Sequence, residues 1–206
     1  MAVDRLVIGG IEIHVLTGRD TTLQDYVADL ARLRITVFRD FPYLYDGSLD
    51  YEENYLRTYT DCPESVVVLA LDGAAVVGAS TGLPLEYETT EFKQPFVDAG
   101  LDPRRIFYCG ESVLLAAWRG RGIYREFFAC RERHARTLGR FDRIALCSVE
   151  RPRDHPLRPS DYVPLDAVWQ RFGYRRRADL VASFTWKDID DVEPRAKPMV
   201  FWDKSL

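Results

Sequence analysis

Two glycines and two arginines near the middle of the chain have the types and spacing that bind a phosphate group. They form the run Arg119-Gly120-Arg121-Gly122, in which either glycine can adopt a positive φ and bring the main chain close to a ligand. The amide N–H groups of such a turn, and of a helix that starts behind it, have no internal partners, and the helix dipole adds partial positive charge there. The run therefore predicts a cradle for an anion, most naturally a phosphate.

The turn needs a strand before it and a helix after it. The segment from Ile106 to Ala116 is an apolar run rich in strand formers, which favours a buried strand. After the turn, apolar or aromatic positions recur at steps of three or four and predict one face of an amphipathic helix: Ile123, Phe127, Cys130, His134 and Leu138. A strand, a glycine turn and a helix in this order would present the free amides at one end of the helix.

Two better-known phosphate loops do not fit this turn. The P-loop pattern G-x-x-x-x-G-K-[ST] occurs nowhere in the sequence. The dinucleotide pattern G-x-G-x-x-G needs a third glycine where Arg125 stands, and a long side chain there would interfere with helix–sheet packing. Asp142 follows Gly122 at a suitable distance, but at the start of the next predicted strand, whereas a ribose-binding acid belongs at a strand's end. The dinucleotide interpretation is therefore rejected.

The stretch resembles the cofactor motif of the GNAT acetyltransferases, R/Q-x-x-G-x-G/A, which lies between the fourth strand and the third helix of that family. The first five positions match, and Tyr124 stands at the sixth, where the family usually has Gly or Ala. The resemblance implies that acetyl-CoA is the cofactor, used as a co-substrate, and that its diphosphate is bound chiefly by main-chain amides of Arg119, Gly120, Arg121, Gly122, Ile123 and Tyr124.

The order of predicted elements along the chain is also that of the GNAT fold. It reads strand, two helices, hairpin, strand, helix, strand, helix, strand, over residues 11–190. The resemblance implies an α/β fold in a single domain over residues 1–206, with a mixed central sheet of about six to seven strands, flanked by helices and splayed between the fourth and fifth strands. The tail, residues 191–206, contains Phe201 and Trp202, so we expect it to dock on its own or a neighbouring subunit, which is compatible with a homodimer.

The reaction that the resemblance implies is acyl transfer from acetyl-CoA to an amine by direct attack on the thioester. The pantetheine arm is expected to lie along the strand before the turn, with main-chain contact at Leu114 and an N–H near Val113 for the thioester oxygen. Glu111 is the predicted general base, because a carboxylate in an apolar strand is costly unless it is paired or used. The alternative for Glu111 is a structural salt bridge to a helix arginine.

A proton donor for the departing thiolate is less clearly marked. Members of the GNAT family often use a tyrosine on the helix after the fifth strand, in the pattern Y-x-x-x-G-F. Trp169 stands at that position here, and its side chain has no hydroxyl proton to donate to the thiolate. Tyr162, seven residues earlier, is the predicted substitute. A coenzyme thiol is acidic enough that no dedicated acid is required.

Two loops supply candidate groups for binding the acceptor. Tyr43 and Tyr45 lie between two predicted helices, in a region that walls the acceptor site in GNAT folds; the alternative is surface packing. The proline-rich loop that begins at Glu150 follows a buried strand, where α/β proteins place binding groups. In this loop Arg151 or Arg153 could bind a carboxylate, and Glu150 or Asp154 could bind an ammonium group. His155 could act as a relay; the alternative is a stiff loop with solvated charges.

Composition narrows the class of protein. The net charge of −4 gives no argument for nucleic acid, and no apolar run approaches the length of a bilayer span. The N-terminus has no signal-peptide core, and the four cysteines are scattered, which favours a cytoplasmic protein with free thiols and no metal site. The sequence thus predicts an acetyl-CoA-dependent N-acetyltransferase of a small-molecule amine, with a silent acyl-CoA-binding sensor and a protein N-acetyltransferase as alternatives. It does not identify the acceptor.

Overall fold

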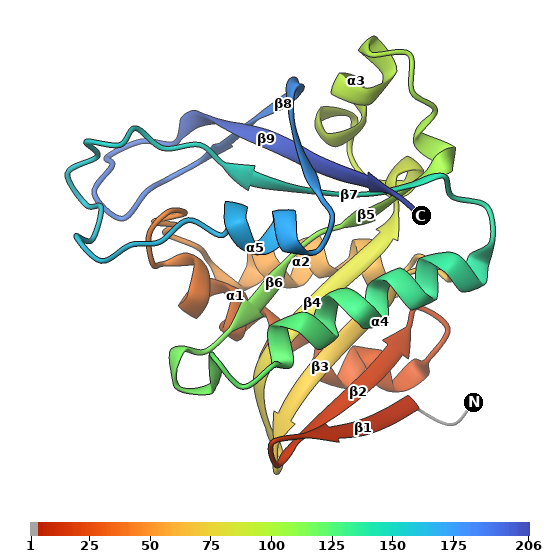
Figure 1. Ribbon diagram of the computed structural model, residues 1–206. Helices are drawn as coiled ribbons and strands as arrows, with labels where there is room; N and C mark the ends of the chain where they lie inside the picture. The colour runs from red at the N-terminus through yellow and green to blue at the C-terminus, as the bar shows by residue number, and fades with distance from the viewer. Residues whose placement is uncertain (1–3) are drawn as a thin grey trace.

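One mixed sheet of nine strands runs through residues 4–206, the part of the chain that the computed structural model describes (Figure 1). The strands are β1 (Asp4–Ile8), β2 (Ile11–Thr17), β3 (Val66–Asp72), β4 (Ala75–Pro84), β5 (Ile106–Cys109), β6 (Ser112–Leu114), β7 (Arg143–Val149), β8 (Arg175–Trp186) and β9 (Arg195–Ser205). The α-helices are α1 (Val27–Phe38), α2 (Leu49–Thr60), α3 (Thr90–Asp98), α4 (Ile123–Leu138) and α5 (Asp166–Arg171). Four short 3₁₀ helices are η1 (Thr21–Tyr26), η2 (Leu85–Tyr87), η3 (Pro103–Arg105) and η4 (Ala116–Trp118).

The sheet divides in the middle, and this division positions the site. Its order is β1-β2-β3-β4-β5-β7-β9-β8, with β6 paired to β4. The strands β5 and β7 are parallel neighbours from the pair Ile106 and Arg143 to the pair Cys109 and Leu146. Beyond that point β6 stays with β4, whereas β7 continues beside β9, so the two halves diverge (Figure 1). The predicted splay between the strands that flank the cofactor helix is confirmed, as is the parallel strand–helix–strand crossover.

Helices cover the two faces of the sheet separately. In Figure 1, α4 and α5 lie in front of the sheet, and α1 and α2 lie behind it. The rear face carries one apolar cluster, which includes Leu30, Leu56, Tyr59, Tyr108 and Cys147. The front face carries the second, which includes Ile123, Phe127, Phe128, Trp169 and Trp202. The predicted amphipathic face of α4 therefore packs on the front of the sheet, and its start points toward the division between β6 and β7.

The structure refines three expectations. The C-terminal tail packs on its own subunit, one of the two expected alternatives, and does so as a full strand, β9, that pairs with both β7 and β8. The apolar run from residue 106 to residue 116 is two strands, because Gly110 and Glu111 both lie opposite Thr81 in a bulge. A first strand, β1, lies before the first predicted one. These changes raise the strand count from the expected six to seven to nine.

Candidate active site

The predicted phosphate turn has the backbone geometry that its glycines allow. Gly120 has a φ of 76° and Gly122 a φ of 86°, both in the left-handed region that other residues rarely adopt. Gly122 is the N-cap of α4, and no side chain of residues 4–206 caps that helix end. The first amides of α4, from Ile123 on, therefore point out of the helix without a side-chain partner. This is the uncapped, positively polarised helix start that the sequence predicts.

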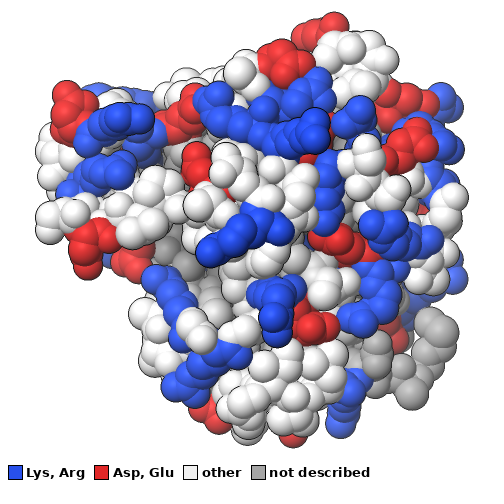
Figure 2. Space-filling model, viewed as in Figure 1, with Lys and Arg blue, Asp and Glu red and all other residues white. Residues whose placement is uncertain are grey.

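The two arginines of the motif are tied to the main chain of the turn itself. Arg119 Nε donates to the carbonyl of Leu114 at 3.1 Å, and Arg121 Nη2 donates to the carbonyl of Ala117 at 3.0 Å. Both side chains are exposed, so they still add positive charge to the surface. Figure 2 shows Lys and Arg side chains over this turn, at the lower left, beside a hollow that separates it from the lobe that contains α5. The arginines thus stiffen the turn and add a positive field around it.

The free edge of β6 offers a second set of main-chain groups. Leu115 donates its N–H to Val77 of β4 at 3.0 Å, and Val113 pairs with Ala79. Because successive residues of a strand direct their amides to opposite sides, Val113 also faces β4, whereas Ser112 and Leu114 face the division. The prediction for Leu114 is consistent with this geometry. The N–H of Val113 is committed to β4, so the donor predicted near it must be the amide of Ser112 or Leu114.

The bulge between β5 and β6 sends Glu111 to the rear face of the sheet. Gly110 makes the bulge possible: a Cβ atom there would lie 1.9 Å from the Tyr59 hydroxyl. The Glu111 carboxylate lies 2.5 Å from Nη1 of Arg34 on α1, and the same guanidinium binds Glu52 of α2 through Nε. All three side chains are nearly fully buried. The salt bridge to a helix arginine, the alternative for Glu111, is therefore present, and one cation serves two carboxylates.

The electrostatics of Arg34 follow from this arrangement. Burial alone lowers the pKa of a guanidinium, but the charges of Glu111 and Glu52 outweigh it and raise the pKa of Arg34 well above its usual value. The Arg34 guanidinium also lies 4.5 Å from the centre of the Tyr55 ring. Neither Arg34 nor Glu52 stands out in the sequence as a site residue. A signal for Arg34 was present, since it occupies the apolar face of α1 with Val27, Leu30 and Ala31.

Tyr43 and Tyr45 lie on the segment between α1 and α2, as predicted, and on the rear side of the division. The Tyr43 ring packs on Phe38 with centroids 4.6 Å apart. Its hydroxyl has no hydrogen-bond partner within residues 4–206, and burial first, then the neighbouring acidic groups of Cys147 and Tyr124, raise its pKa. The Tyr43 ring also stacks on Trp186 of β8, with ring centroids 6.1 Å apart. Burial and the charge of Glu52 raise the pKa of Tyr45.

The loop after β7 is hydrogen-bonded to the segment between α1 and α2, so its Arg151 is not free to bind an acceptor. Arg151 Nη1 and Nη2 bind the Asp188 carboxylate at 2.7 and 2.9 Å. The guanidinium also donates to the carbonyls of Pro42 and Tyr43, at 2.7 and 2.8 Å. Every nitrogen of Arg151 is thus occupied, so a role in binding an acceptor carboxylate is not supported. Its visible effect is to hold Tyr43 in place.

The other predicted residues of this loop are also engaged. Glu150 pairs with Arg176 of β8. His155 accepts from the amide of Leu157 at 3.2 Å and lies against Phe41, with ring centroids 5.7 Å apart. Tyr162 packs edge-on against Phe41 at 4.7 Å, and burial raises its pKa. The loop and the segment around Phe41 therefore form one wall. Tyr162 and His155 share that wall, and the structure pairs neither with Glu111.

The unusual Tyr124 of the motif has a partner that the sequence did not reveal. Trp169 Nε1 on α5 donates to the Tyr124 hydroxyl at 3.0 Å. The Tyr124 ring packs against Phe128 at 5.2 Å and stacks on Phe172 at 6.5 Å, between ring centroids. The two departures from the family pattern, Tyr124 and Trp169, are thus in contact. Burial raises the pKa of Tyr124, and the Trp169 bond opposes that rise.

Other site classes find little support in the described chain. Two surface hollows, of about 370 and 510 Å³, are lined by residues of α2 and of α4 and lie outside the division. Residues 4–206 contain no cluster of His, Cys, Asp and Glu side chains that could hold a metal ion. No helix within the same residues is both long and apolar enough to cross a membrane. The sheet division therefore remains the candidate active site.

Comparisons with known proteins bear on the fold. No protein-family model matches the chain, and no curated protein matches it. Among solved structures, the ribosomal-protein-alanine N-acetyltransferase of Brucella melitensis is 14% identical, with a TM-score of 0.60 over 94% of this chain and 99% of that one. YncA of Salmonella typhimurium, in a structure with acetyl-CoA, is 10% identical, with a TM-score of 0.59 over 96% and 95%.

A third solved structure links the fold to the predicted family by name. A GNAT-family protein of Desulfovibrio desulfuricans is 10% identical, with a TM-score of 0.54 over 95% of this chain and 98% of that one. At these identities the similarity establishes the fold and not the reaction. The chain has the GNAT acetyltransferase fold, as its motif and element order predict.

Proposed function

We propose that the protein transfers an acetyl group from acetyl-CoA to the amine of a small molecule. One observation carries the proposal: the uncapped start of α4, behind Gly120 and Gly122, lies next to the free edge of β6, where the sheet divides. A diphosphate fits the first feature, because free amides and the helix dipole favour an anion. A peptide-like arm fits the second, because an open strand edge accepts an added strand.

The residues divide the work of binding the coenzyme as follows. The amides of the turn, from Gly120 to Tyr124, would hold the diphosphate, with Arg119 and Arg121 adding charge. The outward amides of Ser112 and Leu114 would bind the pantetheine arm and polarise the thioester oxygen. The shared fold with a protein solved with acetyl-CoA supports this assignment. When bound, acetyl-CoA supplies the activated acetyl group.

The reaction moves one proton away from the amine and one onto the sulfur. The amine nitrogen forms a bond to the thioester carbon, the carbon–sulfur bond breaks, and the coenzyme leaves as a thiol. An alkyl ammonium has a pKa of about 10, so a base that takes its proton contributes typically ~10²–10⁴-fold. Glu111 is the base that the sequence predicts, and its carboxylate is buried beside the division. Tyr162 remains the predicted acid, and its raised pKa keeps it protonated at neutral pH.

The walls of the division favour a small acceptor. Arg151 joins the segment around Tyr43 to the loop after β7, so this side of the site is covered. A protein acceptor would need an open groove here. The protein N-acetyltransferase alternative draws support from one structural relative, a ribosomal-protein-alanine N-acetyltransferase. The silent-sensor alternative draws support from Trp169, which stands where the family usually has a tyrosine.

Coenzyme release tests the proposal directly. Purified protein with acetyl-CoA and a panel of small amines should release free coenzyme thiol, detected with a thiol reagent, and form the acetylated amine. Protein that binds acetyl-CoA but releases no thiol with any amine would favour the sensor, and release only with peptides would favour the protein N-acetyltransferase. Glu111→Gln should lower kcat by about 10²-fold or more if Glu111 is the base. Glu53→Gln, an exposed carboxylate on α2, is the control and should not change kcat.

A further inference from the structure

Glu88 is a buried carboxylate to which the proposed chemistry gives no role. It follows η2 at the end of β4, and only 2% of it is exposed. Neither carboxylate oxygen has a hydrogen-bond partner within residues 4–206, although the amide of Thr89 is near enough to favour the charged form. Burying an ionised carboxylate without a partner costs several kcal/mol. A group this costly is explained if a ligand completes its bonding.

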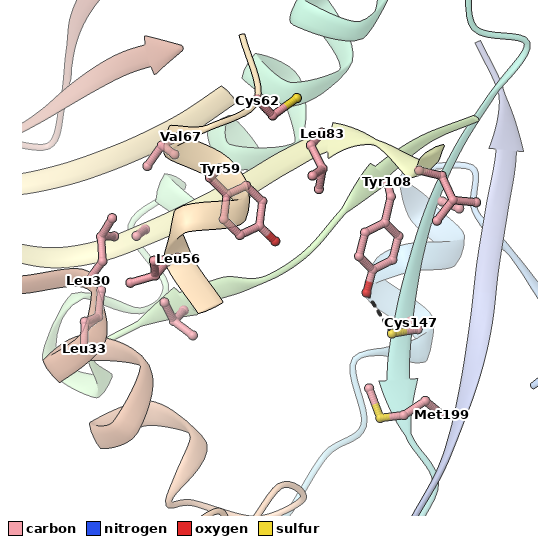
Figure 3. Close-up of a cluster of buried hydrophobic side chains, with 14 of the residues drawn as sticks. Leu30, Leu33, Leu56, Tyr59, Cys62, Val67, Leu83, Tyr108, Cys147 and Met199 are labelled. Atoms are coloured by element: carbon pink, nitrogen blue, oxygen red, sulfur yellow. Dashed lines mark hydrogen bonds between the residues drawn. The ribbon is translucent and has the colours of Figure 1, made fainter. Parts of the chain in front are cut away.

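The carboxylate acts on groups from both sides of the divided sheet. Its charge raises the pKa of Tyr55 and Tyr59 on α2, after burial as the larger cause. It also raises the pKa of Tyr108 on β5 and Cys147 on β7, again after burial. In Figure 3 the hydroxyl of Tyr59 points toward the part of the rear cluster that contains Tyr108, whose own hydroxyl is bonded to Cys147. Glu88 lies two residues before α3, whose Phe92 packs on Tyr108 and on this cluster, so the Glu88 segment borders the rear cluster.

The charges in this buried set do not balance. Three buried carboxylates face the rear of the sheet, those of Glu52, Glu88 and Glu111, and the guanidinium paired with them is that of Arg34. The second buried guanidinium, of Arg131 on α4, donates to the main-chain carbonyls of Thr81 and Glu111 and pairs with none of these carboxylates. Arg34 is already bound to Glu52 and Glu111, so Glu88 is the member left without an ion-pair partner. Lys93 favours the charged form of Glu88 only weakly, since its ammonium donates to the carbonyl of Glu86. A cationic group supplied from outside would complete the set.

We propose that the ammonium group of the acceptor amine docks against Glu88 and transfers its proton to the Glu88 carboxylate. This inference rests on the proposed acetyl transfer and names both its acceptor class and a further catalytic residue. The N–H bond breaks, an O–H bond forms on Glu88, and the neutral amine is left with a lone pair to attack the thioester carbon. After product leaves, the carboxylic acid returns the proton to water. On this proposal Glu88, rather than the Glu111 that the sequence predicts, accepts the amine proton, and the Glu111 carboxylate holds Arg34.

The basicity of Glu88 suits this step. Burial, the largest cause, and the charge of Glu111 raise its pKa to about 7, against the opposing effects of Thr89, Arg34 and Lys93. A base with a pKa near the working pH combines an ionised resting form with a useful affinity for protons. The tyrosines and the cysteine around it do not change charge near neutral pH, because burial raises their pKa values above the usual ones: Tyr55, Tyr59, Tyr108 and Cys147.

The neighbouring side chains indicate the body of the amine. Phe92, on the helix that follows Glu88, lies 5.0 Å from the Tyr108 ring and 4.3 Å from the Phe184 ring, measured between centroids. Tyr55, which Glu88 influences, packs edge-on against Tyr59 at 5.9 Å. An ammonium group at Glu88 would thus have aromatic surface beside it and no second free carboxylate. The arrangement fits a primary monoamine with an apolar or aromatic body better than a polyamine.

A pH profile tests the catalytic part, with 2-phenylethylamine as the probe amine. For the wild type we expect kcat/KM to rise with pH through a limb near 7, as Glu88 ionises. Glu88→Gln should lower kcat/KM by at least about 10²-fold and remove this limb, whereas Glu88→Asp should keep the limb with lower activity. Glu91→Gln, an exposed carboxylate on α3, is the matched control and should behave as the wild type. An unchanged limb in Glu88→Gln would overturn the proposal.

Calorimetry tests the docking part without turnover. At about pH 6 Glu88 is mostly protonated, so binding 2-phenylethylamine as an ammonium should release a proton, measured in two buffers of different ionisation enthalpy. Glu88→Gln should release none, and 2-phenylethanol, which lacks the charge, should release none from the wild type. Equal proton release by Glu88→Gln, or tighter binding of spermidine than of the monoamine, would contradict the site. Proton release without any acetyl transfer would instead refute the proposed function and leave the amine site standing.

Discussion

Two parts of the candidate site lie close together beside β6: the turn between β6 and α4, and the buried charge cluster behind the strand. They are built in opposite ways. The turn is exposed and offers main-chain amides, fixed by the positive φ of Gly120 and Gly122. The charge cluster is buried and consists of side chains from α1, α2 and the bulge, with Glu88 added from the end of β4. The diphosphate of the coenzyme does not vary, so main-chain amides can form its binding site. Recognition of a particular amine needs side chains.

The difference has an energetic consequence. Main-chain amides at a helix start are solvated when no ligand is bound, so the turn costs little to maintain. Buried carboxylates are not solvated, so they must be paired with a cation or must change their protonation state. We therefore expect substitutions in the cluster to affect folding stability strongly, and substitutions in the turn to affect chiefly coenzyme binding.

Removing the cation of the cluster should have the largest effect. Arg34→Met leaves Glu52 and Glu111 buried without a counter-charge, and breaking such a pair costs roughly 3–5 kcal/mol. Urea unfolding should show this loss. The control is Arg32→Met on the same helix, whose exposed pair with Asp29 contributes about 0–1 kcal/mol. Equal losses in the two variants would mean that the cluster is not the costly region described above.

Glu88 should make stability depend on pH. Its pKa is raised from the ordinary 4.5 to about 7, so the unfolded chain gives up this proton first as the pH increases. The folded state binds more protons between these values, and the free energy of unfolding falls through that window. At about 1.4 kcal/mol per pH unit, the total is on the order of 3 kcal/mol.

Glu88→Gln removes this group and should remove the fall. Unfolding free energies measured at about pH 5 and about pH 8 should show the variant gaining on the wild type at the higher pH. A difference between the two proteins that does not change with pH would show that Glu88 does not titrate in this range. Stability sacrificed at neutral pH is what a group kept for its chemistry would show.

The smallest effect is expected at the contact between the two departures from the family motif. Trp169→Phe removes the N–H that binds the Tyr124 hydroxyl and keeps most of the apolar packing, so it should cost about 0.5–1.5 kcal/mol. If the bond only positions Tyr124, Tyr124→Phe should cost a similar amount, and the double variant should cost less than the two losses added together. Additive losses would show that the two side chains are not coupled.

Sequence reasoning succeeded where the determinants are local. The steps of three and four after Gly122 predict α4, the glycines predict the positive φ values, and the motif predicts the fold. It predicted that the tail docks but not that it does so as a strand, because the apolar pattern does not show which strands β9 pairs with. It predicted a donor near Val113 but not which amide faces outward, because the bulge at Gly110 and Glu111 sets the direction of the β6 amides.

The charged part of the site could be read only partly from the sequence. Glu111 stood out because it interrupts an apolar strand. Glu88 did not, since Glu86 and Glu88 lie two residues apart and only the folded structure distinguishes the buried Glu88 from the half-buried Glu86. Arg151 looked like a free binding group, but its partners come from segments more than a hundred residues earlier and from Asp188. Long-range contacts of this kind leave no local signal.

The most direct test of the account compares the two glycine caps of α4 in acetyl-CoA binding. Gly122 and Gly139 cap opposite ends of the helix, both with positive φ, and an added Cβ would meet no close atom at either end. An alanine at either position should strain the backbone by about 1–2 kcal/mol. Calorimetric titration should show the wild type and Gly139→Ala binding acetyl-CoA alike, and Gly122→Ala binding at least about tenfold more weakly. No binding by the wild type, or equal binding by all three proteins, would contradict the claim that this turn holds the coenzyme.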